Sequence, residues 1–544
     1  MPVDYHQPND YRGGWKSAIF IIFVEMGERF AYYGIAGNLI MYLTKVMEEP
    51  LAKSAKIVNS WNAVSSLALF IGAFFADSYL GRFNTTLISS SIYLLGLTLM
   101  TISTSAAIPH DPRAPLFFAA LYITAIGEGG HKPCVQTFAA DQFDEDTPEQ
   151  KNTKSSFFNW WYLGIAIGAM TAVLVVVYVE DNVSWTVGFS IPTTVVGLAI
   201  LVFLIGSRTY RVDRPVGSPF TRVAQVIVAA FIKRNVRNEN DGCGLCYNDD
   251  GFSGLEVHKL APTNQFRCLD HAMMIDDEDK PNKERNPWRL CSQNQVEEVK
   301  LILRLIPIWV CTFAYAIIVA QVHTFFIKQA QTLNLSIGPH FKIPPASFQV
   351  IPGITILISV PIYDKIFVPT MRRITNIPSG INTLQRIGIG LGLSIITIAV
   401  AALVETKRVN IATKHGLVDN PKAIVPMSVG WLVPQFMIMG LSDFFTYVGM
   451  QEIFYDQMPE GMRSVGSAFT NGALGVGALM SNAVISLVQV ATSRSSGGMW
   501  LVSNLNRAHL DHFYWVLAGF CTFDLLVYVL VAKWYVWKKT LGDL

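Results

Sequence analysis

The chain is poor in charged residues along its whole length. Only 15% of its 544 residues are charged, whereas 51% are hydrophobic. A typical soluble globular protein carries about 25% charged residues. Because the deficit is spread over the entire chain, the sequence predicts a polytopic membrane protein.

Several kinds of site are also missing from the sequence. The 42 basic and 40 acidic residues nearly balance, and no basic patch with interleaved aromatic residues occurs, so we expect no nucleic-acid partner. The seven cysteines are scattered. Cys243 and Cys246 have CxxC spacing, but no second pair or histidine cluster follows at zinc-site distances. No HExxH, Ser/His or paired-Asp catalytic motif appears. We therefore expect no metal, no cofactor and no enzymatic activity.

Long apolar runs are what the sequence does contain. Each has close to the ~20 residues that a helix needs to cross the hydrocarbon of a bilayer. Six precede a long polar segment and six follow it, which predicts an all-α protein of twelve transmembrane helices: a bundle over 1–207, a linker over 208–296 and a bundle over 297–544. The runs lie at about 17–45, 58–80, 85–106, 115–137, 156–179, 185–207, 300–327, 346–368, 383–404, 428–453, 464–491 and 512–537.

Lysine and arginine in the short loops predict the orientation, because cytoplasmic loops are enriched in both. We expect both termini to be cytoplasmic. This orientation places the following residues inside: Arg82, Arg208, Arg211, Arg372, Arg373, Arg386, Lys538 and Lys539. The outward loop predicted at 405–427 weakens the bias without reversing it, since it holds Lys407, Arg408, Lys414 and Lys422.

The first part of the linker has an amphipathic pattern. Residues 208–237 hold seven basic side chains against one acid. Apolar residues recur there at helical spacing: Val223, Val226, Ile227, Ala230 and Phe231. Such a helix lies on the inner leaflet, attracted to anionic lipid, or packs under the bundle as a linker helix. Both interpretations remain open from the sequence.

The two halves have similar sequences at the end of the second apolar run of each half. GAFFADSYLGR, residues 72–82, contains Asp77 and Arg82, and YDKIFVPTMRR, residues 363–373, contains Asp364 and Arg372. An acid at a helix end followed by basic residues at corresponding places indicates internal duplication, on which many transporters are built. We expect these acids and arginines to pair in one state and separate in another. The alternative is simple anchoring at the inner leaflet.

The stretch VEMGERFAYYG, residues 24–34, places charges inside the first apolar run. Each charge at the centre of a bilayer costs roughly 2.5–3.5 kcal/mol on the translocon scale. Glu25 and Arg29 are four residues apart, and Glu28 and Tyr32 extend the same helical stripe. Two carboxylates beside one guanidinium cannot all be neutralised internally, so one acid is expected to carry a proton part of the time. The alternative is a static structural ion cluster.

Two further charges lie in apolar runs of different halves. In GEGGHKPC, residues 127–134, Lys132 follows Glu128 by four residues, and in GLSDFFTYVGMQE, residues 440–452, Asp443 lies mid-span. One charge of each sign in different halves predicts a pair that opens and closes across a central cavity. His131 is more often a packing residue than a proton carrier in such a place. The neighbouring glycines are expected to let this helix approach others closely.

These motifs resemble those of the proton-dependent oligopeptide transporter family. Residues 25–34 resemble its ExxERFxYYG motif. Six further stretches resemble the plant nitrate/peptide transporter branch in particular, and they occur in the same order over nearly the whole chain. They are GNLIMYLT, FFADSYLGRF, GGHKPCVQTFAADQFDE, SFFNWWY, FRCLDHA and LQRIGIG. The resemblance implies the major facilitator fold and proton-coupled uptake by alternating access.

The resemblance also implies residue roles. Glu25, Glu28 and Arg29 match the family's proton-coupling triad, with Arg29 also near substrate, and Lys132 matches the lysine of its fourth helix. Asp443 matches the acidic partner in its tenth helix, which is usually a longer glutamate.

Three positions bear on the substrate and its regulation. Val319 stands where the nitrate-transporting type carries a histidine, and valine cannot donate a hydrogen bond to nitrate. Ala320 stands where the bacterial peptide transporters carry an acid. Thr85 matches a threonine that serves one nitrate-transporting type as a phospho-switch. We expect aromatic walls of the substrate site from Tyr32, Tyr33, Trp309 and Phe313.

The sequence therefore favours a proton symporter for a small anionic or zwitterionic solute, such as a peptide, an organic anion, a hormone or a specialised metabolite. Arg29 and Lys132 would attract its anion, and Asp443 would meet a positive group. Two alternatives stay open, a proton-coupled nitrate transporter and a substrate-sensing receptor on a transporter scaffold. The expected partners are the solute, protons and membrane lipid, in the plasma membrane or the vacuolar membrane.

Overall fold

The computed structural model is built of long helices. It describes residues 13–105, 110–143, 148–212, 219–234, 260–275, 286–337, 341–376, 380–458, 463–493 and 499–537. The helices of the first half are α1 (Gly14–Lys45), α2 (Leu51–Phe75), α3 (Gly81–Ser103), α4 (His110–Ala140), α5 (Pro148–Asn182) and α6 (Trp185–Gly206). Those of the second half are α8 (Gln293–Cys311), α9 (Phe313–Val322), α10 (Phe325–Gln331), α11 (Val350–Ile362), α12 (Val368–Thr375), α13 (Thr383–Lys414), α14 (Val433–Gln457), α15 (Arg463–Ser493) and α16 (Leu510–Trp534).

Each predicted apolar run falls on a helix or on a short series of helices. The seventh run is broken, because α8 and the segment of α9 and α10 meet at an angle of 46°. Within the described residues, seven helices are long and apolar enough to cross a membrane, or eight if this bent pair is one span. Among the helices of 18 residues or more outside the bent pair, α1, α4 and α14 are absent from that set, and they carry Glu25, Lys132 and Asp443. Charge lowers their hydropathy, and burial inside the bundle keeps that charge away from lipid.

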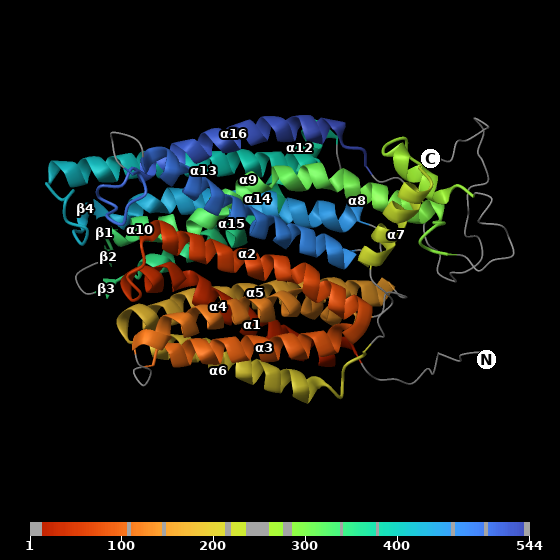
Figure 1. Ribbon diagram of the computed structural model, residues 1–544, viewed down its shortest axis with the longest axis horizontal. Coiled ribbons are helices and arrows are strands. Elements are labelled where there is room, and N and C mark those ends of the chain that lie inside the picture. Colours follow the sequence, from red (N-terminus) through yellow and green to blue (C-terminus); the bar gives the residue numbers. More distant parts are fainter. Residues whose placement is uncertain are drawn as a thin grey trace.

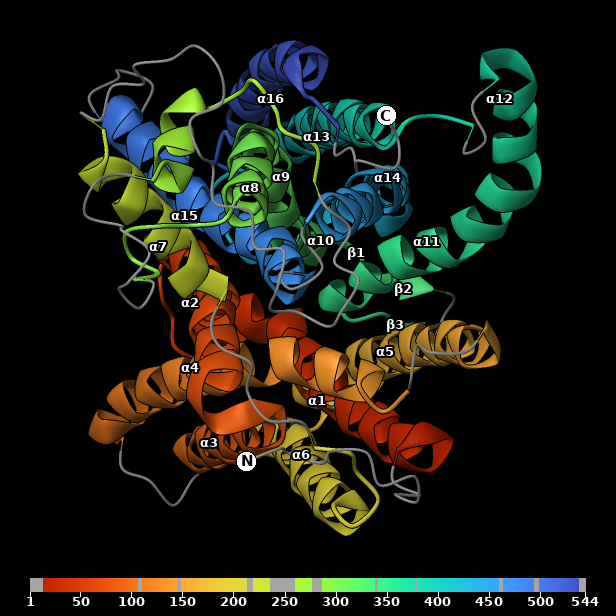
Figure 2. The ribbon, with the colours of Figure 1, turned by 90° about the vertical axis from the view of Figure 1, so that its right-hand side faces the viewer.

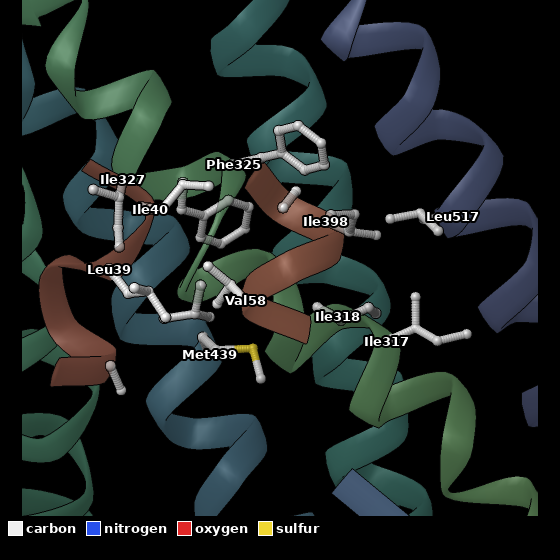
Figure 3. Packing of buried hydrophobic residues seen from close by; sticks show 14 of the residues in the cluster. Leu39, Ile40, Val58, Ile317, Ile318, Phe325, Ile327, Ile398, Met439 and Leu517 are labelled. Atoms are coloured by element: carbon white, nitrogen blue, oxygen red, sulfur yellow. The ribbon is translucent and has the colours of Figure 1, made fainter. Parts of the chain in front are cut away.

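The helices gather in two groups. Figures 1 and 2 show α1–α6 on one side and α8–α16 on the other, with α2 and α15 packed along each other between them. One apolar core continues across both groups. In Figure 3, Leu39, Ile40 and Val58 of the first group lie among Ile317, Phe325 and Ile398 of the second. The chain is therefore an all-α polytopic protein, and the domain boundaries at 207 and 296 stay a prediction.

The two ends of the bundle differ. One end carries two small sheets, in which β1 (Leu333–Asn334) pairs in parallel with β4 (Val425–Ser428) and β2 (Ser336–Ile337) pairs antiparallel with β3 (Phe341–Lys342). The opposite end carries α7 (Pro219–Ile232) of the linker (Figure 1). We call these the strand end and the linker end.

Both described ends of the chain lie at the linker end. The backbone N–H of Gly14, at the start of α1, donates to the carbonyl of Gln142 at 2.7 Å, just beyond α4. The ring of Trp534, the last residue of α16, lies edge-on to Phe266 of the linker with centroids 6.4 Å apart. This placement on one side is what an even number of spans requires. The assignment of that side to the cytoplasm stays a prediction.

The linker helix α7 (Pro219–Ile232) has two apolar faces. One packs on the short 3₁₀ helix η2 (Arg267–Met273) and on the start of α8 through Val226, Ala229, Ala230, Leu269, Ala272, Cys291, Val296 and Val299. The other face leaves Ile227 48% and Phe231 64% exposed. The helix thus packs under the bundle, as one interpretation expects, and keeps an exposed apolar face that the lipid interpretation requires. Cys243 and Cys246 lie outside the described residues.

The predicted internal duplication has a backbone counterpart. A single π-helical turn follows α2 at Ala76–Leu80, and another follows α11 at Tyr363–Phe367. Asp77 and Asp364 are each the second residue of their turn. Such π turns are rare and occur mostly at functional sites. Their occurrence at corresponding places supports the duplication.

The predicted outward loop at 405–427 is wrong in its first part. The helix α13 continues to Lys414, because its extra turns bury an ion pair in place of apolar residues. Arg408 donates to both carboxylate oxygens of Glu405, at 2.9 Å from Nε and 2.6 Å from Nη2. Its remaining donors meet Asn506 and the carbonyl of Leu505, each at 2.7 Å. Arg408 is thus a structural charge of the second half and contributes nothing to the loop bias.

Replacing Arg408 with alanine is expected to destabilise the second half. The substitution leaves the Glu405 carboxylate buried without its charge partner, which costs about 3–5 kcal/mol. We expect a lower unfolding temperature in detergent than for the wild type. Lys414→Ala, in the exposed last turn of the same helix, is the matched control and should leave that temperature unchanged. Equal unfolding temperatures for Arg408→Ala and the control would contradict this account.

Candidate functional site

The charges of the first helix form one buried cluster. Arg29 Nε lies 3.2 Å from Glu25 Oε1, and Arg29 Nη2 lies 2.5 Å from Glu28 Oε2. The three residues are between 2% and 8% exposed. The i, i+4 spacing places Glu25 and Arg29 on one face of α1, as the sequence predicts. A guanidinium that serves two carboxylates leaves the trio with one negative charge in excess when both acids are ionised.

The fourth helix reaches this cluster because its glycines permit close packing. A Cβ at Gly129 would lie 2.1 Å from that of Ala68 on α2, and one at Gly127 would lie 2.5 Å from the backbone nitrogen of Tyr93 on α3. The expectation of close approach at these glycines is thus confirmed. Lys132 and Glu128 form an ion pair on this helix, and the Ser65 hydroxyl donates to the Glu128 carboxylate.

Tyr32 joins the charges of the two helices. The Lys132 ammonium lies 4.3 Å from the centroid of its ring, and the Arg29 guanidinium lies 5.6 Å from it. The ring stacks on Trp61 at 5.4 Å, and its hydroxyl donates to Asn62 at 3.0 Å. Tyr32 therefore lies within cation–π distance of both cations.

Asp443 faces this cluster from the second half. It accepts a hydrogen bond of 2.6 Å from the Tyr315 hydroxyl on α9. Tyr33, whose ring lies edge-on to Tyr32 at 5.2 Å, is close enough to both Arg29 and Asp443 for their charges to act on its hydroxyl. In this conformation Lys132 pairs with Glu128 and Asp443 with Tyr315, so the predicted Lys132–Asp443 bridge is not formed.

Trp309, Phe313 and Val319 lie outside the charged cluster. Trp309 donates to the Phe469 carbonyl on α15 at 2.7 Å, and its ring lies edge-on to Phe313 at 4.8 Å. Val319 packs against the apolar core. These three side chains belong to the wall of the second half in this conformation.

The residues predicted to gate at the linker end have separate surroundings. Arg82 forms an ion pair with Asp141, just beyond α4. Asp364 and Arg372 are exposed. The side chain of Asp77 lies outside the described part of the structure. Thr85, the matched phospho-switch position, is buried and donates to the Gly81 carbonyl at 2.9 Å, so its hydroxyl is covered in this conformation.

A polar junction at the strand end joins the two halves, and no pattern in the sequence predicts it. Lys328 of α10 donates to Thr44 of α1 at 3.0 Å, and Gln349 donates to the carbonyl of Gly37 at 2.7 Å. Asn482 of α15 donates to Ser60 of α2 at 2.9 Å. These partners are polar residues of ordinary type whose pairing depends on helices far apart in sequence. The halves are closed together at this end.

An apolar hollow of about 320 Å³ lies between α1, α5 and α6. Phe23, Ile167 and Leu198 line it and are about half exposed. None of the site's charges lines this hollow, and its position on the outside of the first half suits a lipid chain. It is therefore not the candidate site.

Two solved structures with a similar fold are POT family transporters. The chain is similar to an auto-inhibited POT family peptide transporter, with a TM-score of 0.73 and 19% identity over 96% of this chain and 97% of the other. It is also similar to the POT family transporter PepTSo, with a TM-score of 0.70 and 20% identity over 95% and 98% of the chains. At this identity the likeness shows the major facilitator type of fold.

Sequence comparison identifies the family. Residues 83–501 match the model of the POT family. Protein NRT1/PTR FAMILY 5.4 of Arabidopsis thaliana is 51% identical over 534 residues, covering 97% of this chain and 96% of the relative. Protein NRT1/PTR FAMILY 5.14 of the same plant is 44% identical over 540 residues, covering 97% and 94%. The chain belongs to the POT family, in its plant NRT1/PTR branch, and is a multi-pass membrane transporter and not an enzyme.

Proposed function

We propose that this transporter is a proton-coupled symporter that moves a small anionic or zwitterionic solute by alternating access. The observation that carries the proposal is the cluster of Glu25, Glu28 and Arg29 beside the Glu128–Lys132 pair. The buried Arg29 and the half-buried Lys132 are both already paired with acids, and a fourth acid, Asp443, faces them from the other half.

This arrangement couples the solute to the proton by competition. A solute carboxylate that binds Arg29 competes with Glu25 and Glu28 for the charge of the guanidinium. A carboxylate deprived of its cation in a buried place is stabilised by taking up a proton. Proton uptake and anion binding therefore favour each other, which is the requirement for symport. The same exchange at Lys132 would release Glu128.

Charge sign selects the solute class. Arg29 and Lys132 together suit a carboxylate or a comparable anion, and Asp443 suits an ammonium at the other end of a zwitterion. Tyr32 and Tyr33 would form the aromatic wall between these ends. One of the similar solved structures is a POT family transporter in complex with 5-aminolevulinic acid, a molecule that has both groups.

Alternating access needs two ends that open in turn. The bonds of Lys328, Gln349 and Asn482 close the strand end in this conformation. Formation of the Lys132–Asp443 bridge would draw the halves together nearer the linker end, and the paired acids and arginines after the second and eighth spans would support it. With cytoplasmic termini, the closed strand end faces outward. We place the protein in the plasma membrane or the vacuolar membrane, with the linker dividing bundles 1–207 and 297–544.

The proposal is tested by uptake into oocytes at acidic and neutral external pH, with a mixed panel of solutes measured by mass spectrometry. We expect accumulation of at least one anionic or zwitterionic solute, greater at acidic pH and accompanied by inward current. Saturable binding of a solute without flux would instead support a receptor.

Replacing Glu25 or Glu28 with glutamine is expected to uncouple transport at whichever acid carries the proton. The amide keeps the side chain's size but cannot be ionised, so pH-driven accumulation should be lost. Counterflow of solute should persist, because it needs no net proton movement. Glu49→Gln breaks only a surface pair with Lys53 and serves as control. Wild-type pH dependence in both the Glu25 and the Glu28 variants would refute the assignment.

Nitrate uptake is expected to be weak or absent at low concentration. Val319 offers no hydrogen-bond donor, and its side chain packs against the core. Nitrate is nevertheless the second candidate solute, because relatives in the branch carry the name NRT1/PTR. Oocyte currents with nitrate are compared with those of each organic solute. Saturable nitrate currents larger than any organic current would show that nitrate is the substrate.

Exchanging the charges of Lys132 and Asp443 tests the gate. Lys132→Ala and Asp443→Ala should each reduce transport severely. The first leaves Glu128 buried without its cation, and the second leaves the buried Tyr315 hydroxyl without its acceptor. The swap of Lys132→Asp with Asp443→Lys should restore part of the transport if the bridge acts only as a latch. It should restore none if Lys132 also binds the solute's anion.

A double-mutant cycle of these two positions measures their coupling. We expect losses that are less than additive in the double alanine variant. Lys53→Ala and Asp419→Ala, two exposed charges, are the controls for charge loss. Additive losses with no interaction energy would mean that Lys132 and Asp443 do not form a gate.

A further inference from the structure

The imidazole of His131 lies at the carboxylates of the first helix. The residue is 2% exposed, on α4, and sequence alone favours a packing role for it. A ring nitrogen of His131 and one carboxylate oxygen from each of Glu25 and Glu28 lie within 4.8 Å of one another. The fold thus brings a third titratable group to the pair of acids.

A hydrogen bond to Ser90 of α3 determines which ring nitrogen carries the proton. His131 Nδ1 lies 2.7 Å from Ser90 Oγ, and Ser90 Oγ also lies 2.7 Å from the Thr86 carbonyl. The carbonyl can only accept, so the single hydroxyl proton of Ser90 points to it. His131 Nδ1 must then donate to Ser90, and the neutral ring presents an unprotonated Nε2. This assignment follows from the hydrogen-bond network.

The unprotonated ring nitrogen and the acids lack a hydrogen bond that one proton between them could supply. His131 Nε2 and Glu25 Oε2 are both buried and have no hydrogen-bond partner within the described residues. Both are acceptors when the carboxylate is ionised, and an unsatisfied buried acceptor costs about 1–3 kcal/mol. A proton on the carboxyl would satisfy both atoms once the carboxyl has turned towards the ring, because the new O–H can then donate to Nε2.

We propose that His131 Nε2 and the carboxyls of Glu25 and Glu28 form one proton-binding site, in which the imidazole accepts the hydrogen bond of the protonated acid. The inference rests on the proposed symport and adds to it the group that accepts a hydrogen bond from the protonated acid. The proton enters as the O–H of a carboxylic acid, stays bonded to that oxygen and leaves from it, so no other bond changes. The present spacing requires the carboxyl to turn towards the ring or to act through one water.

The surrounding charges suit an imidazole that accepts and stays neutral. Arg29 faces it from α1 together with Glu25 and Glu28, and Lys132 and Glu128 lie near it on its own helix. Tyr32 and Tyr93 are the neutral titratable groups of the same site, on α1 and α3. When one of the three acids is protonated, the two cations balance the other two carboxylates, so a neutral ring leaves the site without net charge.

The test compares His131→Leu, which removes the acceptor, with His131→Gln, whose side-chain oxygen retains one. Uptake of a transported solute is measured against external pH in oocytes. For His131→Leu we expect the pH of half-maximal uptake to fall by about one unit, the size that loss of one buried hydrogen bond produces. The shift in His131→Gln should be smaller. His415→Leu, at an exposed histidine, is the control.

Counterflow at equal pH on both sides separates this role from a structural one, and it should stay near the wild-type rate in both variants. Ser90→Ala removes the bond that fixes the tautomer and should shift the pH profile in the same direction. If His131→Leu fails to reach the membrane, the pH profile of Ser90→Ala is compared with that of the wild type instead. A wild-type pH profile in His131→Leu, or in Ser90→Ala when that variant stands in, would overturn the inference while leaving symport intact. Absence of pH-driven uptake in the wild type would overturn symport itself.

Discussion

Burial of Arg29 between two carboxylates is the constraint on which the rest of the structure depends. Ions inside an apolar bundle are costly to desolvate, so their attraction must be supplemented by polar neighbours. The fold supplies them from α4, through the Glu128–Lys132 pair, and from α2, through Ser65, Trp61 and Asn62. The glycines of α4 serve the same purpose, because side chains at these positions would keep α4 from packing close to α2 and α3.

An excess of acid over base makes this cluster a place for protons and anions. Each cation already has carboxylate partners, so an incoming anion must displace one, and a displaced carboxylate gains from protonation. In the proposed site, His131 gives the protonated acid a partner that the ionised acid cannot use. The proposed coupling rests on exchange of partners among a few buried groups and needs no long pathway between distant sites.

The closed strand end and the unformed Lys132–Asp443 bridge describe one conformation of a two-state cycle. Polar bonds of moderate strength join the halves at the strand end, with Lys328, Gln349 and Asn482 as donors. Hydrogen bonds of this kind contribute about 1 kcal/mol each. A junction held by bonds of that size can open without breaking a core, which suits a transporter whose halves must rock against each other.

Much of the fold and the centre of the site could be predicted from the sequence. A long apolar run can cross lipid in few ways other than as a helix, because its backbone polar groups must pair within the segment. The spacing of Glu25, Glu28 and Arg29 on one helix determines their contacts by local geometry. Tertiary structure decided what depends on other helices: the Tyr315–Asp443 bond, the Glu405–Arg408 pair within an extended α13, and the strand-end junction. It also decided the position of His131 beside Glu25 and Glu28, and its contact with Ser90 of another helix. Local periodicity determines which residues share a face, but only packing determines which faces meet.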